Sequence, residues 1–185
     1  GEVSIALEKS LESLQLNIYS SFGMTETISH FALRKIGANK NYICLPDISI
    51  SQSSNGCMII HAPQLHDEAI HTKDLIELNS SCSFLWLGRS DFAIESGGSK
   101  IIPEQIEEKL RPFIKERFFI SSMKHKQLNN QIILIIEGAS HELNEKIFDG
   151  LEKYHRPKQV FFIRQFKAAA NGKIDRIASR KLLDI

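Results

Sequence analysis

The sequence predicts a mixed fold, part α/β and part α+β, built from two unequal pieces. Three observations lead to this prediction. An amphipathic helix pattern and a short strand open the chain, a series of short β-rich runs follows, and strand, helix, strand, strand and helix patterns come last. The chain of 185 residues is long enough to bury a real core in one domain or in two small ones. We place the domains at residues 1–88 and 89–185.

The first segment has a helical apolar stripe. Leu7, Leu11 and Leu14 recur at helical spacing with charged residues between them, which predicts an amphipathic helix that needs a sheet to cover. Residues 16–19 are predicted to be the strand that follows. Residues 20–27 then form the turn at the strand's carboxyl end, where open α/β sheets bind their ligands.

Short β-rich runs separated by Pro, Gly, Ser and Asn occupy the next part of the chain. Such spacing predicts a small, mostly antiparallel sheet or a distorted, barrel-like one. The predicted strands are residues 42–45, 48–51, 57–61, 75–78 and 83–87.

A junction follows at residues 86–101. Gly88 gives backbone freedom and Arg89 and Asp91 place opposite charges beside it, while Gly97-Gly98 between apolar residues is a two-glycine hairpin signal. Taken alone, this stretch fits equally well an ordinary hairpin with flanking charges.

The last piece alternates strands and helices. Pro103 followed by glutamates opens a helix, because proline suits the first turn and carboxylates complement the helix dipole there. The run Ile-Ile-Leu-Ile-Ile at residues 132–136 predicts a strand buried on both faces. The predicted elements are strands at residues 118–123, 131–137 and 159–163, a helix carrying Leu143, Ile147 and Leu151, and a closing helix at residues 175–183.

Composition excludes several classes of function. A net charge of +1, from 23 basic and 22 acidic residues, gives no basic field for nucleic acid or anionic membranes. Three cysteines without Cys-x-x-Cys spacing argue against a disulfide framework or a structural zinc site, and indicate a reducing cytoplasm. No segment approaches the ~18 apolar residues of a membrane span, and no charged-then-apolar leader opens the chain.

Three histidines in one region raise the question of a metal site. His61, His66 and His71 lie near Asp67 and Glu68, but five-residue spacing puts them on no common helix or strand face. We therefore do not predict zinc binding.

Three motifs in order carry a family resemblance. Gly88-Arg89-Ser90-Asp91 with residues 96–107 resembles the hinge and following loop of the acyl- and aryl-CoA synthetases, the adenylate-forming ligase superfamily. Residues 22–27, Phe-Gly-Met-Thr-Glu-Thr, resemble its aromatic-Gly-x-Thr-Glu motif, and residues 171–176 resemble its lysine loop. Residues 25–30 and 86–89 look most like the o-succinylbenzoate-CoA ligases of menaquinone biosynthesis.

The resemblance implies the end of a large AMP-binding domain followed by a small α+β domain. The chain begins at Gly1 without Met and lacks the Gly- and Ser/Thr-rich phosphate loop of such ligases. We therefore expect a C-terminal fragment that is inactive alone. The implied reaction joins a carboxylate to ATP as an acyl-adenylate, and CoA then displaces AMP. ATP, Mg²⁺ and CoA are thus the implied cofactors and co-substrates.

Lys173 falls on the family's adenylation lysine. Two anions meet in that step, so a cation must neutralise the developing charge. The alternative is an Asn-Gly turn with a solvated lysine. The family usually has proline and threonine where this sequence has Lys167 and Ala169, which puts the rigidity of the loop in question.

Residues of the Thr-Glu motif have implied roles toward ATP. Phe22 would stack on adenine beside Gly23, Thr25 would donate to a phosphate oxygen, and Glu26 would hold Mg²⁺ as a hard oxygen ligand. The alternative is a buried Phe before a capped helix. Ser29 and His30 would lie near the acyl pocket, although a lone histidine is more often a structural hydrogen-bonding group.

Asp74 and Arg89 are the remaining nucleotide contacts that the resemblance implies. Asp74 would accept hydrogen bonds from ribose hydroxyls, although Lys73 replaces the family's glycine before it. Arg89 would contact ribose or phosphate, or else form a plain interdomain salt bridge.

The hinge at Asp91 would let the small domain rotate, so that Gly97 and Gly98 replace the lysine loop and let the pantetheine arm of CoA pass close to backbone.

The predicted function is therefore a carboxylate-CoA ligase acting on o-succinylbenzoate. Another aryl- or acyl-CoA ligase, a carrier-loading adenylation domain, or a non-catalytic remnant of the fold are the alternatives. The sequence leaves open whether the protein forms a homo-oligomer.

Overall fold

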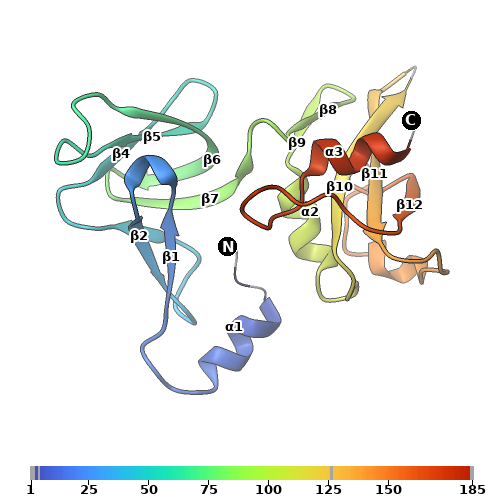
Figure 1. Ribbon diagram of the computed structural model, residues 1–185, viewed down its shortest axis with the longest axis horizontal. Helices are drawn as coiled ribbons and strands as arrows, with labels where there is room; N and C mark the ends of the chain where they lie inside the picture. Colours follow the sequence, from blue (N-terminus) through green and yellow to red (C-terminus); the bar gives the residue numbers. More distant parts are fainter. Residues whose placement is uncertain (1–2, 4, 126, 184–185) are drawn as a thin grey trace. The chain divides into compact units, whose positions relative to one another are not determined.

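The computed structural model describes residues 3, 5–125 and 127–183 and divides into two compact units, Gly1–Asp91 and Phe92–Ile185. Figure 1 shows the elements of both units. The division falls at Asp91, where the sequence places a hinge. Rotation at that residue stays a prediction, as does the assignment of the two pieces to parts of an enzyme.

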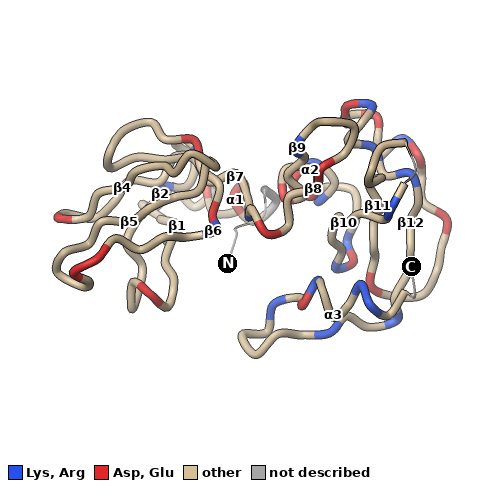
Figure 2. Tube along the Cα trace, turned by 90° about the horizontal axis from the view of Figure 1, so that it is seen from above, with Lys and Arg blue, Asp and Glu red and all other residues tan. Residues whose placement is uncertain are grey.

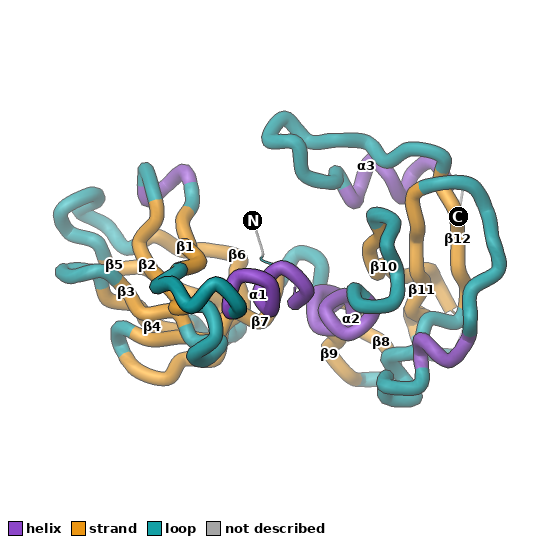
Figure 3. Tube along the Cα trace, turned by 90° about the horizontal axis from the view of Figure 1, so that it is seen from below, coloured by secondary structure: helices purple, strands orange, loops and turns teal. Residues whose placement is uncertain are grey.

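The first unit is built on one seven-stranded sheet in which every pairing is antiparallel. Figure 3 shows its strands in orange. The strand order is β1-β2-β3-β7-β6-β5-β4. The small antiparallel sheet predicted from the sequence is therefore confirmed. Its strands are β1 (Tyr19–Gly23), β2 (His30–Lys35), β3 (Tyr42–Cys44), β4 (Ser49–Gln52), β5 (Cys57–His61), β6 (Ile70–Ser80) and β7 (Ser83–Arg89).

The start of this unit differs from the prediction. Helix α1 (Ile5–Glu12) forms as expected, and Glu8 on it pairs with Arg34 of β2, but Leu7 and Leu14 stay about half exposed. The strand predicted at residues 16–19 lies instead at β1, which pairs with the unpredicted β2. The apolar pattern of the sequence does not indicate β1 because the strand contains polar serines. Ser20 is nevertheless buried, and its hydroxyl bonds the Tyr42 hydroxyl at 3.1 Å.

The second unit opens with a hairpin and a helix. Strands β8 (Ile94–Ser96) and β9 (Ser99–Ile101) pair across Gly97-Gly98, as the sequence predicts, and α2 (Pro103–Leu110) begins at its proline. A three-stranded sheet follows, in which β11 (Asn129–Glu137) is central. It pairs antiparallel with β10 (Phe118–His125) and parallel with β12 (Gln159–Ile163).

Strand β11 is buried on both faces, as predicted. Residues 132–136 are all 0–2% exposed. Ile132, Leu134 and Ile136 belong to a core that α2 covers, whereas Ile133 and Ile135 belong to a second core with Phe119 and Phe166. One strand is thus shared by two apolar cores.

The helix predicted around Leu143, Ile147 and Leu151 is wrong. Only a 3₁₀ turn, Glu145–Phe148, forms there, capped by the Asn144 side chain, which accepts from the Lys146 N–H at 3.0 Å. The three apolar residues nevertheless pack on the first core, so an irregular segment meets the same packing need.

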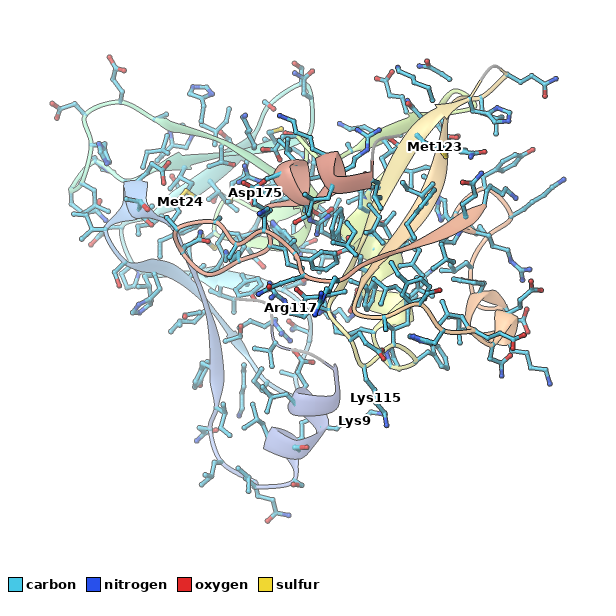
Figure 4. The ribbon with its side chains drawn as sticks, turned by 45° about the vertical axis from the view of Figure 1, so that its right-hand side comes forward. Lys9, Met24, Lys115, Arg117, Met123 and Asp175 are labelled. Atoms are coloured by element: carbon cyan, nitrogen blue, oxygen red, sulfur yellow. The ribbon has the colours of Figure 1, made fainter. Side chains whose placement is uncertain are left out.

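The predicted closing helix forms as α3 (Arg176–Arg180) and a 3₁₀ turn, Lys181–Leu183. Asp175 caps it by accepting from the Ala178 N–H at 2.9 Å (Figure 4).

Charges of both signs are mixed along each unit (Figure 2). Within the described residues, every helix is too short or too polar to cross a lipid bilayer.

Candidate functional site

The turn between β1 and β2 carries the Thr-Glu motif and projects two polar side chains. A 3₁₀ helix, Thr25–Thr27, forms the turn (Figure 4 labels the preceding Met24). The buried Thr27 hydroxyl accepts from the Met24 N–H at 3.1 Å and lies 2.7 Å from the Ser29 carbonyl oxygen. Thr27 thereby fixes the turn, and Thr25 and Glu26 are left exposed.

Gly23 has a packing reason to be glycine. A Cβ there would lie 2.5 Å from the Ser29 carbonyl oxygen and 2.6 Å from the His30 Cα, closer than real Cβ atoms come. Beyond it, Ile28 takes a φ of 63°, which is strained for a β-branched residue, and is 79% exposed. Backbone strain of this kind gathers at functional sites, which favours this turn as one.

A second loop supports the turn. His66 follows Glu26 by 40 residues, and its Nε2 lies 2.7 Å from the Glu26 carbonyl oxygen. A ring N–H at that nitrogen donates to the carbonyl and holds the backbone that carries the Glu26 carboxylate.

The other histidines of this region have separate surroundings. His61 Nε2 bonds the Ser51 hydroxyl at 2.8 Å, and His71 lies on β6 opposite Ile59. Over the described residues, no three His, Cys, Asp or Glu side chains are grouped to hold a metal ion.

Phe22 lies in an aromatic cluster. Its ring makes edge contacts with Phe31, Tyr42 and Phe84 at centroid distances of 5.2–5.7 Å, and the Trp86 ring lies at 6.5 Å. Phe31 and Phe84 are fully buried, whereas Phe22 is half-buried. The cluster fixes the Phe22 ring; its stacking on adenine stays a prediction.

Asp74 lies on β6 and is held by Trp86 of the neighbouring strand β7. It is 7% exposed, and its Oδ1 accepts from the Trp86 indole N–H at 2.9 Å. Its backbone N–H donates to the Thr72 hydroxyl at 3.1 Å, which itself donates to the Met58 carbonyl. Residues 72–74 lie within β6, so Lys73 in place of glycine occupies a strand position and not a turn.

Arg89 joins two carboxylates. It faces Asp74 across β6 and β7, with Nη1 3.7 Å from Asp74 Oδ2. Its Nε and Nη2 donate to the two oxygens of Asp91 at 3.1 and 2.9 Å, and Lys73 Nζ lies 3.8 Å from Asp91. The hydrogen bond from Arg89 lowers the pKa of Asp91. These ion pairs of Arg89 all lie within the first unit.

Lys173 lies in a small hairpin-like loop of the second unit. Ala168 bridges to Ile174, and Ala169 and Lys173 share a backbone bond at 2.8 Å. The turn is closed by Gly172, with φ 77°, and by Asn171, whose side chain accepts from the Lys173 N–H at 3.1 Å. The loop is ordered by this ladder without the family's proline and threonine, and the Lys173 side chain is exposed.

The glycine pair forms the β8–β9 turn. Gly97 and Gly98 have φ values of 56° and 82°, which side chains rarely adopt, and the Gly97 N–H donates to the Leu128 carbonyl at 3.1 Å. A Cβ on Gly98 would meet nothing within 4 Å.

The structure therefore brings the predicted residues of the first unit together in two groups. Phe22, Gly23, Thr25, Glu26, Ser29 and His30 share the β1–β2 hairpin, and Asp74, Arg89 and Asp91 share the β6–β7 end. Trp86 connects these two groups, and Gly97, Gly98 and Lys173 occupy two loops of the second unit. Trp86, His66 and Thr27 are positioning contacts that sequence reasoning missed.

No family model matches the chain. Among curated proteins, it is 28% identical over 190 residues to the 2-succinylbenzoate–CoA ligase of Lactococcus lactis, covering 91% of this chain and 42% of that protein. The enzyme of the same name from Bacillus cytotoxicus is 24% identical over 201 residues, covering 90% and 42%. A vibriobactin-specific 2,3-dihydroxybenzoate-AMP ligase of Vibrio cholerae is 30% identical over 122 residues, covering 61% and 22%.

The chain is also similar to solved structures. An acyl-CoA synthetase (AMP-forming)/AMP-acid ligase II-like protein of Dyadobacter fermentans is 31% identical with a TM-score of 0.51, covering 99% of this chain and 56% of that one. The o-succinylbenzoate CoA synthetase of Bacillus subtilis, in complex with its acyl-adenylate intermediate, has a TM-score of 0.85 at 18% identity, covering 100% and 45%. The chain thus spans less than half the length of the curated relatives that it matches.

Proposed function

Because the chain corresponds in sequence and fold to the carboxyl-terminal part of adenylate-forming enzymes, we propose that it belongs to an ATP-dependent carboxylate–CoA ligase. The enzyme forms an acyl-adenylate and pyrophosphate, and CoA then displaces AMP to give the thioester. The 2-succinylbenzoate–CoA ligases among its relatives support o-succinylbenzoate as the acid. The motif resemblance of residues 25–30 and 86–89 adds menaquinone biosynthesis as the pathway, and the three cysteines without Cys-x-x-Cys spacing favour the cytoplasm.

One observation carries this proposal: an aromatic ring and a fixed carboxylate of the first unit are connected through Trp86. Phe22 lies 6.5 Å from the Trp86 ring, and Trp86 bonds Asp74. Adenosine presents a flat base and hydroxyl donors, for which an aromatic side chain and a carboxylate acceptor are suitable partners. Arg89, beside Asp74, adds a cation for ribose or phosphate oxygens.

The Thr25–Thr27 turn fits the phosphate end of the nucleotide. Mg²⁺ in nucleotide sites is held by one or two carboxylates together with substrate phosphates, so the exposed Glu26 suits it as a single hard ligand. Mg²⁺ would neutralise phosphate charge when bound. The hydroxyl of Thr25 would donate to a phosphate oxygen, and Ser29 and His30, whose side chains lie 3.2 Å apart, would line the acyl pocket.

The second unit supplies the groups that we assign to the two half-reactions. The exposed ammonium of Lys173 would stabilise the charge that develops as carboxylate and α-phosphate meet. The side-chain-free hairpin at Gly97 and Gly98 would let the pantetheine arm pass in the thiol step. Rotation at Asp91 would exchange the two loops.

A second function is favoured by one match. The 30% identity to a 2,3-dihydroxybenzoate-AMP ligase supports an enzyme that adenylates an aryl acid. In this second function, a carrier-loading adenylation domain transfers the acyl group to a carrier thiol and not to CoA. The two functions share adenylation and differ in the thiol.

The test uses the full-length protein with a panel of carboxylic acids. Pyrophosphate release identifies the acid, and addition of CoA identifies the acceptor. We expect o-succinylbenzoate to give the highest kcat/KM for a CoA thioester, above benzoate and fatty acids. Adenylation without a CoA thioester would favour the second function, and no pyrophosphate release with any acid would overturn the ligase proposal.

A further inference from the structure

The indole of Trp86 makes a contact that no motif of the sequence indicates. Its Nε1–H donates to Asp74 Oδ1 at 2.9 Å, from the neighbouring strand and across 12 residues of sequence. Asp74 is 7% exposed, so this hydrogen bond to a charged acceptor is shielded from water and is stronger than a neutral one.

Apart from its N–H, the Trp86 ring lies in apolar surroundings. The half-buried Trp86 ring packs with the aromatic cluster of the first unit, near Phe22. An indole in such a place has a fixed plane, and its single N–H points in one direction. The cluster therefore sets the direction of the donor, and the donor sets the rotation of the Asp74 carboxylate.

The carboxylate keeps acceptor capacity. Two carboxylate oxygens offer about four acceptor positions. Over the described residues, the indole takes one of these on Oδ1, and Arg89 Nη1 stands 3.7 Å from Oδ2, beyond hydrogen-bond distance. Asp74 is thus held at one oxygen while the other keeps acceptor positions for a hydroxyl donor.

We propose that Trp86 is a positioning residue for nucleotide binding, because its indole N–H fixes the Asp74 carboxylate in the orientation that receives the ribose hydroxyls. This inference rests on the proposed function. It adds to it that ribose discrimination depends on the Trp86–Asp74 pair and not on Asp74 alone.

A purely structural role for Trp86 predicts a different effect of its replacement on nucleotide binding. If the ring only fills the aromatic cluster, its replacement weakens every nucleotide equally through loss of stability. If it orients Asp74, the loss concerns only nucleotides that carry the hydroxyl. The ribose of the ligand therefore separates the two roles.

The experiment measures Kd values of ATP, 2′-deoxy-ATP and 3′-deoxy-ATP for the full-length protein and its variants. Trp86→Phe keeps the ring and removes the donor. We expect it to weaken ATP binding about tenfold, the range for a hydrogen bond to a charged group. The loss should largely vanish with the deoxynucleotide that lacks the hydroxyl bound by Asp74.

Three further variants complete the design. Asp74→Asn should show the same dependence on the ribose. Tyr42→Phe is the matched control, since it removes the polar group of another ring in the same cluster, one that bonds Ser20 and not Asp74; it should leave all three Kd values unchanged. Trp86→His, which restores a ring N–H, should recover part of the ATP affinity.

The outcomes separate the two proposals. If Asp74→Asn selectively loses ribose discrimination while Trp86→Phe weakens all three nucleotides equally, the proposed function stands and the role of Trp86 is overturned. If the unaltered protein binds no adenine nucleotide, or Asp74→Asn has no effect on any of them, the proposed nucleotide site fails first.

Discussion

Arg176 and Glu107 form a buried ion pair in the second unit, with Nη2 2.8 Å from Oε2 and side chains 18% and 6% exposed. The other oxygen of Glu107 accepts from the Ile120 N–H at 2.8 Å. The guanidinium also lies 4.7 Å over the Phe92 ring. One arginine, three residues after Lys173, therefore joins the lysine loop to α2 and to the first residue of the unit.

Removal of one partner of this pair should destabilise the second unit strongly. Glu107→Ala leaves an unbonded Ile120 N–H and a largely buried guanidinium whose remaining carboxylate neighbour, Glu104, lies 3.9 Å away, which together should lower the free energy of unfolding by about 3 kcal/mol. Chemical denaturation monitored on the second unit measures this. The exposed pair Arg156–Asp149 is the control, and Asp149→Ala should cost less than about 1 kcal/mol. Equal losses for the two variants would contradict a structural role for Glu107.

Lys173→Ala in the full-length protein should separate the half-reactions. Loss of the ammonium should slow adenylation by about two to four powers of ten, while supplied acyl-adenylate and CoA should still react. Single-turnover assays of each step measure this. Lys167→Ala removes another exposed cation at the base of the same loop and should leave adenylation close to normal. If Lys173→Ala slows both steps equally, loop exchange is wrong.

Gly98→Leu should have the converse effect. A leucine would adopt a φ of 82° at a cost and place a bulky side chain on the hairpin, so thioester formation should slow while adenylation survives. Gly138→Leu introduces similar backbone strain, at φ 131° and with equally open surroundings, outside the hairpin. A thiol-step defect in both variants would point to general destabilisation.

Acid should weaken the first unit through Asp91. Since Arg89 lowers the folded-state pKa of Asp91, this carboxylate contributes stability above its ordinary pKa of about 3.9 and loses it as the pH falls through the lower, folded value. Asp91→Asn should therefore flatten the acid limb of a plot of unfolding free energy against pH. Arg89→Met should flatten the same limb, and the double variant should add little. An unchanged acid limb in Asp91→Asn would contradict the assignment.

Reactivity should differ between Cys44 on β3 and Cys82 in the β6–β7 turn. Burial raises the pKa of Cys44 to about 11, so near pH 8 only about one thiol in a thousand is ionised. Cys82, whose carbonyl accepts from the Cys44 N–H, is exposed. Iodoacetamide should therefore modify Cys82 first and Cys44 only as the pH rises. Peptide mass spectrometry locates the label, and faster labelling of Cys44 would show that the strand opens.

Elements with strong local signals were predictable from the sequence. The Gly97-Gly98 turn, the proline start of α2 and the bounds of β5 and β12 follow from turn chemistry and apolar patterning. Strand β1 was displaced because its polar Ser20 is buried only through a partner, Tyr42, that lies 22 residues away. The helix expected near Ile147 failed because three apolar residues at helical spacing pack equally well from an irregular segment.

The residues of the candidate site likewise divide into those that local sequence indicates and those that only the structure shows. Motif residues such as Glu26, Asp74 and Lys173 could be proposed from the sequence because their neighbours match a motif, and their roles stay predictions. Their supporting contacts could not, since Trp86 and His66 act across 12 and 40 residues of sequence. Only strand register and loop packing bring those groups together.

The shared strand β11 has a consequence for how the second unit unfolds. Its alternate side chains belong to two cores, so displacement of β11 would disrupt both cores at once. Neither core should therefore unfold without the other. Local opening should be confined to loops such as residues 168–174, and the amides of residues 132–136 should exchange with solvent only through global unfolding. The loop that carries Lys173 should therefore open locally, whereas the sheet and its two cores should unfold together in a single cooperative step.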